Sequence, residues 1–370
     1  MTKSKAVGST VLCLGSLVFF ALANPRAGAA PMYTVTDLGT LPGYSSASTA
    51  TGINSAGQIV GVSYLAGGGS HAFLYSGGQM QDLGVLPGDG ASQAYGINNS
   101  GQVVGTSGMH AFLWTNTGGM QDLGMAPGMN KSYAYAINDS GQIVGASFLS
   151  TPPPDISVAR TSFVYTSDTG MQAFGNGSTS LGINSAGQIV GVANSAYNGH
   201  AFLYSGGQMQ YLGTLGGLSS GASGMNNAGQ IVGYADTAIG DWDYHAFLYT
   251  IGGGMQDLGT LLGGTYSDAY GINDSGQIVG YADSSNSNHA FLYTRGSMLD
   301  LNSIIDPTSG WTLECANAIN DNGWIVGYGI NPTGQQDAFL MKPIPEPATL
   351  SLLALGALAL ERRRGGFLTL

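Results

Sequence analysis

The chain has 370 residues, of which 61 are glycine and only 8% are charged. Acidic residues outnumber basic ones by 21 to 10, for a formal net charge of -11, and six of the ten basic residues lie near the two ends of the chain. Such a negative surface repels phosphate backbones and anionic lipids, which excludes nucleic acid as a partner. The glycines follow no three-residue period, so they indicate turns rather than a collagen-like fold.

The first residues have the order of a secretory leader. Lys3 and Lys5 precede the apolar run 11–23, which is followed by the small residues 27–30. Charged, apolar and small segments in this order predict a signal peptide over residues 1–29 and an exported mature chain. Because Cys13 falls in the leader, Cys315 is the only cysteine of the mature chain. We therefore expect no internal disulfide and a buried strand thiol.

One decapeptide, Gly-Ile-Asn-x-x-Gly-Gln-Ile-Val-Gly, recurs seven times with small changes, at intervals of 40 to 47 residues. A period in this range is typical of repeat architectures, in which each copy is one supersecondary unit. The copies begin at Gly52, Gly96, Ala136, Gly182, Gly224, Gly271 and Ala318.

Each repeat contains four short segments rich in β-branched and aromatic residues and bounded by Gly, Asn, Ser or Pro, which predicts antiparallel strands. In the second repeat they cover residues 91–98, 101–107, 110–115 and 119–124. Four strands in 40 to 47 residues match a propeller blade better than a β-solenoid coil. No window has the period of an amphipathic helix. We predict an all-β, seven-bladed β-propeller over residues 30–342.

The two ends of the repeat region predict how the ring closes. Residues 33–39 match the fourth strand of a repeat, although no first three strands precede them. The last repeat has three strands and then reaches Pro343 without a fourth. Donation of the N-terminal strand to the seventh blade completes the ring and removes exposed sheet edges.

Histidine and aspartate recur at fixed repeat positions, on the third and the fourth strand. Across the hairpin that joins these strands, each Asp is expected close to its His. One such pair per blade does not converge on a single point, so we expect structural hydrogen bonds and no metal site. No Gly-x-Ser-x-Gly elbow is present and no unrepeated constellation stands out, so no enzymatic activity is predicted. The pairs are His71 with Asp82, His110 with Asp122, His245 with Asp257 and His289 with Asp300; His200 stands opposite Tyr211.

The loops between second and third strands differ most between repeats, and propeller geometry places them on one face. Variable loops on a fixed scaffold are where binding sites usually lie, although tolerated surface variation explains them equally well. No cofactor is predicted, except that the carboxylates of the loop around Asp241 and Asp243 are suitable ligands for calcium. The predicted ligand residues are Tyr64, Tyr197, Asp241, Trp242, Asp243 and Tyr244, on a wider surface with Asp155, Asp236 and Asp283.

The phrases His-Ala-Phe-Leu-Tyr and Gly-Ile-Asn-x-x-Gly-Gln-Ile-Val-Gly, over residues 33–341, resemble the HAF-repeat family of extracellular bacterial proteins. Repeats three and seven depart from the first phrase, with Thr161 and Asp337 in place of His. The resemblance implies a secreted or surface protein without an established activity.

The end of the chain, residues 343–370, resembles a PEP-CTERM sorting signal. It has Pro345, Glu346 and Pro347, the apolar run 348–360, and then Arg362, Arg363 and Arg364. Thirteen apolar residues in a helix span about 20 Å, short of the roughly 30 Å hydrocarbon core, which predicts a short transmembrane helix with transient membrane association. The resemblance implies processing by exosortase-type machinery, the surface or matrix of a Gram-negative bacterium, and association with exopolysaccharide.

Two functions follow from these expectations. The first is an exported, non-enzymatic surface protein that binds a glycan or another surface ligand through its variable loops, since exposed Trp and Tyr offer flat apolar faces with polar tips. The second is a purely structural, self-associating matrix component. Loss of binding after changes at Trp242 and Tyr244 favours the first, and indifference to them favours the second.

Overall fold

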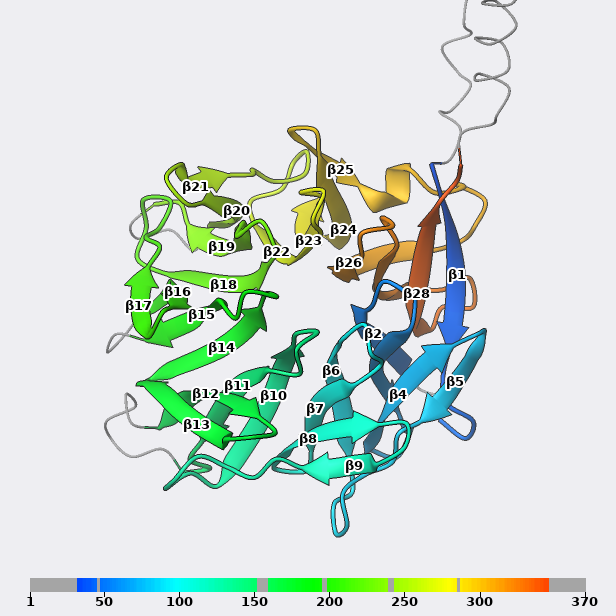
Figure 1. The fold of residues 1–370 in the computed structure, drawn as a ribbon. Coiled ribbons are helices and arrows are strands. Elements are labelled where there is room, and N and C mark those ends of the chain that lie inside the picture. The colour runs from blue at the N-terminus through cyan, green and yellow to red at the C-terminus, as the bar shows by residue number, and fades with distance from the viewer. Residues whose placement is uncertain are drawn as a thin grey trace, which may run out of the picture. The chain divides into compact units, whose positions relative to one another are not determined.

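The computed structural model describes residues 32–44, 47–151, 159–194, 198–238, 243–284 and 287–345. Over these residues the regular structure is β-strand apart from one short 3-10 helix, η2 (Leu301–Ser303). The strands form seven four-stranded antiparallel sheets, each of which is one blade of a ring (Figure 1). The prediction of an all-β, seven-bladed β-propeller is confirmed.

The first four blades follow one another along the chain, and their strands pair in sequence order. Blade one has β2 (Ala47–Ile53), β3 (Ile59–Tyr64), β4 (Ser70–Ser76) and β5 (Gln79–Asp82). Blade two has β6 (Ser92–Ile97), β7 (Val103–Ser107), β8 (His110–Thr115) and β9 (Gly119–Asp122). Blade three has β10 (Lys131–Ile137), β11 (Ile143–Phe148), β12 (Arg160–Thr166) and β13 (Gly170–Asn176). Blade four has β14 (Ser178–Ile183), β15 (Ile189–Asn194), β16 (Gly199–Ser205) and β17 (Gln208–Tyr211).

Blades five and six continue this order, and blade seven takes its fourth strand from the start of the chain. Blade five has β18 (Ser220–Met225), β19 (Ile231–Asp236), β20 (Tyr244–Thr250) and β21 (Gly254–Asp257). Blade six has β22 (Ser267–Ile272), β23 (Ile278–Ser284), β24 (Ser287–Thr294) and β25 (Ser297–Asp300). Blade seven has β26 (Thr312–Ile319), β27 (Ile325–Ile330), β28 (Gln336–Pro343) and β1 (Tyr33–Gly39).

The ring closes between β1 and β28, as the sequence predicts. The two strands are antiparallel, with Thr36 opposite Leu340 and Tyr33 opposite Pro343 (Figure 1). Leu38 of β1 is buried in an apolar cluster that includes Phe73 of blade one and Leu340 of blade seven. The N-terminal strand therefore joins the first repeat to the last.

The Phe of each third strand forms the centre of its blade. All seven of these phenylalanines are 0% exposed. Each stands opposite the last glycine of the decapeptide on the second strand, as Phe73 does opposite Gly61. A Cβ atom at Gly61 would lie 2.0 Å from the Thr49 carbonyl oxygen and 2.8 Å from the Phe73 ring. The repeated Ile-Val-Gly therefore ends in glycine because the neighbouring strand and ring leave no room for a side chain.

The Asn of each decapeptide closes its own turn and also contacts the next blade. In the first copy Asn54 Oδ1 accepts from the backbone N–H of Gln58, and Gly57 has a φ of 78°. Asn54 Nδ2 donates to the backbone carbonyl of Asn98 in blade two at 3.1 Å. The same contact is repeated in every blade, which gives a closed ring of seven hydrogen bonds from Asn54 through Asn98, Asn138, Asn184, Asn226, Asn273 and Asn320.

Candidate ligand-binding site

The structure describes three of the six predicted ligand residues. Tyr64 ends β3 and is half-buried, whereas Asp243 is exposed and immediately precedes Tyr244, the first residue of β20. Tyr64 belongs to blade one and Tyr244 to blade five, which are not adjacent in the ring. Outside the described residues lie Tyr197, Asp241 and Trp242, and also Asp155 of the wider surface.

Tyr244 lies within a group of aromatic side chains from blades five and six. Its hydroxyl is 3.0 Å from the hydroxyl of Tyr281. Its ring centroid is 5.5 Å from that of Tyr266 and 5.7 Å from that of Tyr234. The Tyr281 ring is 5.7 Å from Tyr270 and 6.2 Å from Tyr266. We call these five partly exposed residues the Tyr244 cluster: Tyr234, Tyr244, Tyr266, Tyr270 and Tyr281.

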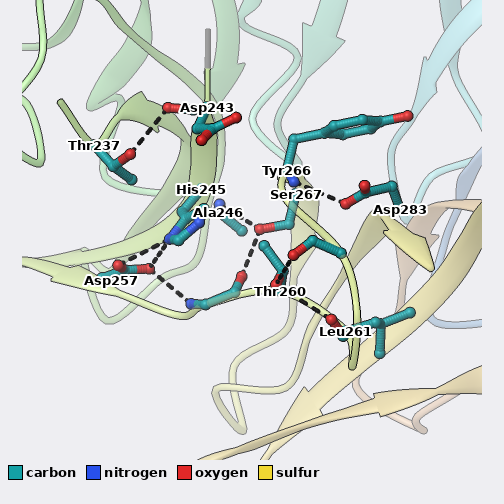
Figure 2. A network of polar contacts seen from close by, with 12 residues as sticks. Thr237, Asp243, His245, Ala246, Asp257, Thr260, Leu261, Tyr266, Ser267 and Asp283 are labelled. Atoms are coloured by element: carbon teal, nitrogen blue, oxygen red, sulfur yellow. Dashed lines mark hydrogen bonds and ion pairs between the residues drawn. The ribbon is translucent and has the colours of Figure 1, made fainter. Parts of the chain in front are cut away.

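Two carboxylates at the ends of second strands hold the loops beside this cluster. Asp283 Oδ1 accepts the backbone N–H of Tyr266 at 2.8 Å (Figure 2). Asp236 Oδ2 accepts the backbone N–H of Ser219 at 2.9 Å. The backbone carbonyl of Asp243 accepts from the N–H and the hydroxyl of Thr237, both at 3.1 Å. These contacts fix the backbone on either side of Tyr244 and Tyr266.

A buried carboxyl group lies behind the tyrosines. Asp268 of β22 is 8% exposed and stands opposite Tyr281 in the strand register. Its Oδ1 atom is buried and has no hydrogen-bond partner among the described residues. Burial raises the pKa of Asp268 to about 8, which the N–H of Ala269 partly opposes. Burial also raises the pKa of the Tyr244 and Tyr281 hydroxyls, so they stay neutral donors and acceptors.

A cavity of about 410 Å³ lies at the centre of the ring, where the first strands of all seven blades meet. None of its lining residues is Asp, Glu, Lys or Arg. Arg160 of β12, which interacts electrostatically with the lining residue Tyr135, is one of four basic residues in the repeat region. Burial lowers the pKa of the half-buried Arg160, while Tyr135 and Tyr234 oppose that change. The cavity is lined by Thr51, Tyr95, Tyr135, Leu181, Ser223, Tyr270, Cys315, Asn317 and Tyr328.

Neither Arg160 nor the tyrosines that line the central cavity were among the predicted site residues. Tyr95 and Tyr135 occupy the same position of successive first strands, with ring centroids 5.3 Å apart. Tyr234, Tyr281 and Tyr328 likewise share one position, immediately after Ile-Val-Gly. Aligning the repeats in the sequence reveals both sets of tyrosines, and neighbouring blades bring equivalent repeat positions close together.

At its Asn-turn end the ring encloses a second cavity of about 270 Å³. The amide groups of the Asn ring all donate to the backbone of the next blade, and six of them also donate to the Gln of their own turn, for example Asn54 to Gln58 Oε1 at 2.8 Å. In blade seven Trp324 takes the place of this Gln. Asp139 and Asp274 accept backbone N–H groups of the preceding blade, from Asn99 and Asn227. The polar groups at this end are therefore used to join blades.

The four repeated His–Asp pairs are in hydrogen-bond contact, with Nδ1 to carboxylate distances of 2.7 to 2.9 Å. In blade five Asp257 also accepts the N–H of Gly259, whose carbonyl accepts the hydroxyl of Ser267 in blade six. That serine in turn accepts the N–H of Ala246, next to His245 (Figure 2). The pairs thus belong to a chain of contacts between neighbouring blades. In blade four the His200 ring lies 5.9 Å from Tyr211.

The described residues contain no group of three or more His, Cys, Asp or Glu side chains arranged to hold a metal ion. Cys315 is a free, buried thiol, and burial raises its pKa. No helix within the same residues is long and apolar enough to cross a membrane, and the apolar run 348–360 lies outside them.

The geometry defines the chain as a seven-bladed β-propeller with a tyrosine-lined centre. Residues 343–364 match the PEP-CTERM protein-sorting motif, so the chain has the signal of a protein exported to the cell envelope or surface and recognised by exosortase. No curated protein matches the chain.

Solved structures with a similar fold include two peptidases. For the Pyrococcus horikoshii acylaminoacyl peptidase the TM-score is 0.52 at 9% identity, covering 82% of this chain and 54% of that one. For a Mycobacterium tuberculosis puromycin-hydrolyzing peptidase it is 0.52 at 10% identity, covering 85% of this chain and 56% of that one. The chain thus spans about half the length of each, and at such low identity the likeness concerns the fold alone.

Proposed function

We propose that this exported surface protein binds a glycan at the Tyr244 cluster. The observation behind the proposal is the close packing of five partly exposed tyrosines from two adjacent blades. Tyrosine presents a flat apolar face and a polar tip, which suits the apolar C–H face and the hydroxyl rim of a sugar ring. The acidic composition of the chain favours neutral or cationic glycans over anionic ones.

The ends of the chain complete the proposal. Residues 1–29 act as a signal peptide, residues 30–342 form the HAF-repeat propeller, and residues 343–370 associate transiently with the membrane until exosortase-type processing. The propeller then remains at the surface or in the matrix of a Gram-negative bacterium. The sorting motif at residues 343–364 supports this route. Mature protein whose mass still includes Arg362, Arg363 and Arg364 would contradict processing.

A glycan array and a native exopolysaccharide binding assay test the site. We expect Tyr244→Ala and Tyr266→Ala each to weaken binding about tenfold, equivalent to ~1.4 kcal/mol. Tyr211→Ala is the matched control, because Tyr211 is 60% exposed on the outer strand of blade four. Equal binding by all three variants, each with an unchanged melting temperature, would place the ligand elsewhere.

The same assay run with calcium and with chelator decides whether a cation assists binding. Asp243 is exposed beside Tyr244 and offers carboxylate oxygens, which calcium prefers. A calcium-dependent site is supported if chelator abolishes binding, calcium restores it, and Asp243→Asn does not bind even with calcium. Binding unchanged by chelator restricts the site to the tyrosines and their neighbours.

A structural role in the matrix is the second candidate, and two exposed leucines favour it. Leu262 is 96% exposed and Leu218 is 47% exposed, in the loops that precede β22 and β18 of adjacent blades. Exposed apolar side chains on one surface favour association between copies. Sedimentation velocity of the wild type and of Leu262→Ser separates the two candidates. Oligomers lost in the variant, together with no glycan binding, support self-association.

A further inference from the structure

Among the residues that the structure describes, a hydroxyl group contacts a repeated His–Asp pair in blade six. Ser287 and His289 lie two residues apart on β24, and Asp300 ends β25. Ser287 Oγ is 3.1 Å from His289 Nε2, and His289 Nδ1 is 2.7 Å from Asp300 Oδ2. Serine, histidine and aspartate are therefore connected in the order of a nucleophilic triad.

The hydrogen bonds of Asp300 favour one order of donors and acceptors in this group. Asp300 Oδ1 accepts the backbone N–H of Asn302 at 2.8 Å and its side-chain N–H at 3.0 Å, so the carboxylate acts as an acceptor. In the neutral imidazole, Nδ1 then carries the proton that is donated to Asp300. The lone pair of Nε2 is left to accept from the Ser287 hydroxyl, which is the arrangement that activates a serine nucleophile.

Ser287 is exposed, and the side chains of His289 and Asp300 are 22% and 26% exposed, so a dissolved substrate has access. The other three His–Asp pairs have no hydroxyl at the position of Ser287. Gly69, Gly108 and Asp243 occupy it in blades one, two and five. The repeat thus supplies matched pairs that lack the nucleophile.

We propose that Ser287, His289 and Asp300 form a catalytic triad that hydrolyses small, solvent-accessible acyl esters. Ser287 Oγ attacks the ester carbonyl carbon while its proton passes to His289 Nε2. The bond to the leaving oxygen then breaks, and the alcohol departs with that proton. Water attacks the resulting acyl-serine, His289 takes the water proton and returns it to Ser287, and a carboxylic acid is released. Asp300 accepts the Nδ1–H of His289 and stabilises the imidazolium throughout.

This activity goes beyond glycan binding and departs from the sequence-based expectation of a non-enzymatic protein. That expectation was based on four equivalent His–Asp pairs and on the absence of an unrepeated constellation in the sequence. The serine is two residues from its histidine on a β-strand, so no motif search for a nucleophile elbow would find it. Because the site is open to water, we expect the rate of serine acylation to increase only through general-base assistance, by about 10²- to 10⁴-fold over an unassisted serine.

The test uses the full chain, a fluorophosphonate probe with peptide mapping by mass spectrometry, and hydrolysis of p-nitrophenyl acetate. We expect one adduct on Ser287, its loss in Ser287→Ala, and at least about 100-fold slower labelling in His289→Ala. His110→Ala removes the matched pair of blade two and should label like the wild type. An adduct at another residue, no adduct, or equal labelling of His289→Ala and wild type would overturn the proposal. If His289→Ala fails to fold, the position of the wild-type adduct decides alone.

Discussion

Closure of the ring by β1 predicts that one apolar residue near the start of the chain stabilises the whole propeller. Leu38 is 7% exposed and packs with side chains of blades one and seven. Thr36, two residues earlier on the same strand, is exposed. Truncation of a buried leucine to alanine removes its transfer free energy and leaves a cavity, at a cost of about 2–5 kcal/mol. An exposed threonine changed to alanine alters stability by about 0.5 kcal/mol or less.

The measurement is thermal unfolding of Leu38→Ala and Thr36→Ala beside the wild type. Unfolding entropy of about 2.1 cal/mol/K per residue over about 310 residues shifts the melting temperature by about 1.5 °C per kcal/mol, so Leu38→Ala should melt about 3–8 °C below the wild type. Thr36→Ala should stay within about 1 °C. Equal melting temperatures for the two variants would refute closure by β1. Deletion of residues 33–39 should lower the melting temperature further, because β28 becomes an exposed edge.

Three further outcomes are expected. The pKa of Asp268 is raised from 3.8 to about 8 in the folded protein. Between these pH values the unfolded chain has lost a proton that the folded chain keeps, so the free energy of unfolding falls as pH rises. In Asp268→Asn the melting temperature should therefore depend less on pH between 4 and 8. Asn226→Ala breaks the Asn ring and leaves buried groups unpaired, at about 1–3 kcal/mol in urea unfolding, whereas Asn116→Ala, in the exposed turn between β8 and β9, should stay near the wild type. Gly145→Ala places a Cβ atom 2.0 Å from a backbone carbonyl and should cost about 3 kcal/mol, whereas Gly90→Ala meets nothing within 4 Å and should be neutral in the same assay.

The blades could be predicted from the sequence because their signals are local and repeated. In the second repeat the expected segments 110–115 and 119–124 contain the observed β8 (His110–Thr115) and β9 (Gly119–Asp122). The segment 33–39 coincides with β1. Hairpin register alone places Asp82 opposite Phe73 and brings it to His71. Each of these inferences needs only the spacing of residues within about ten positions of one another.

Contacts between blades could not be predicted in the same way, because their partners lie a whole repeat apart. Asn98 is a turn residue by its sequence, yet its side-chain amide donates to Asn138 in the next blade, 40 residues on. Tyr244 belongs to a variable loop by its sequence, yet its hydroxyl contacts Tyr281, 37 residues on. The stacking of repeats brings equivalent positions of neighbouring blades together, and the side chains at those positions determine which contacts form.

The two ends of the ring differ in how much freedom the sequence leaves them. At the Asn-turn end every blade repeats the same amide contact, so a change in one copy breaks a closed ring. At the other end Tyr266 of blade six is held by Asp283, while the equivalent position in blade one is Ala47, the first residue of β2. Side chains there differ between blades without loss of a ring contact, so a ligand surface can be built from two blades while all seven keep the scaffold.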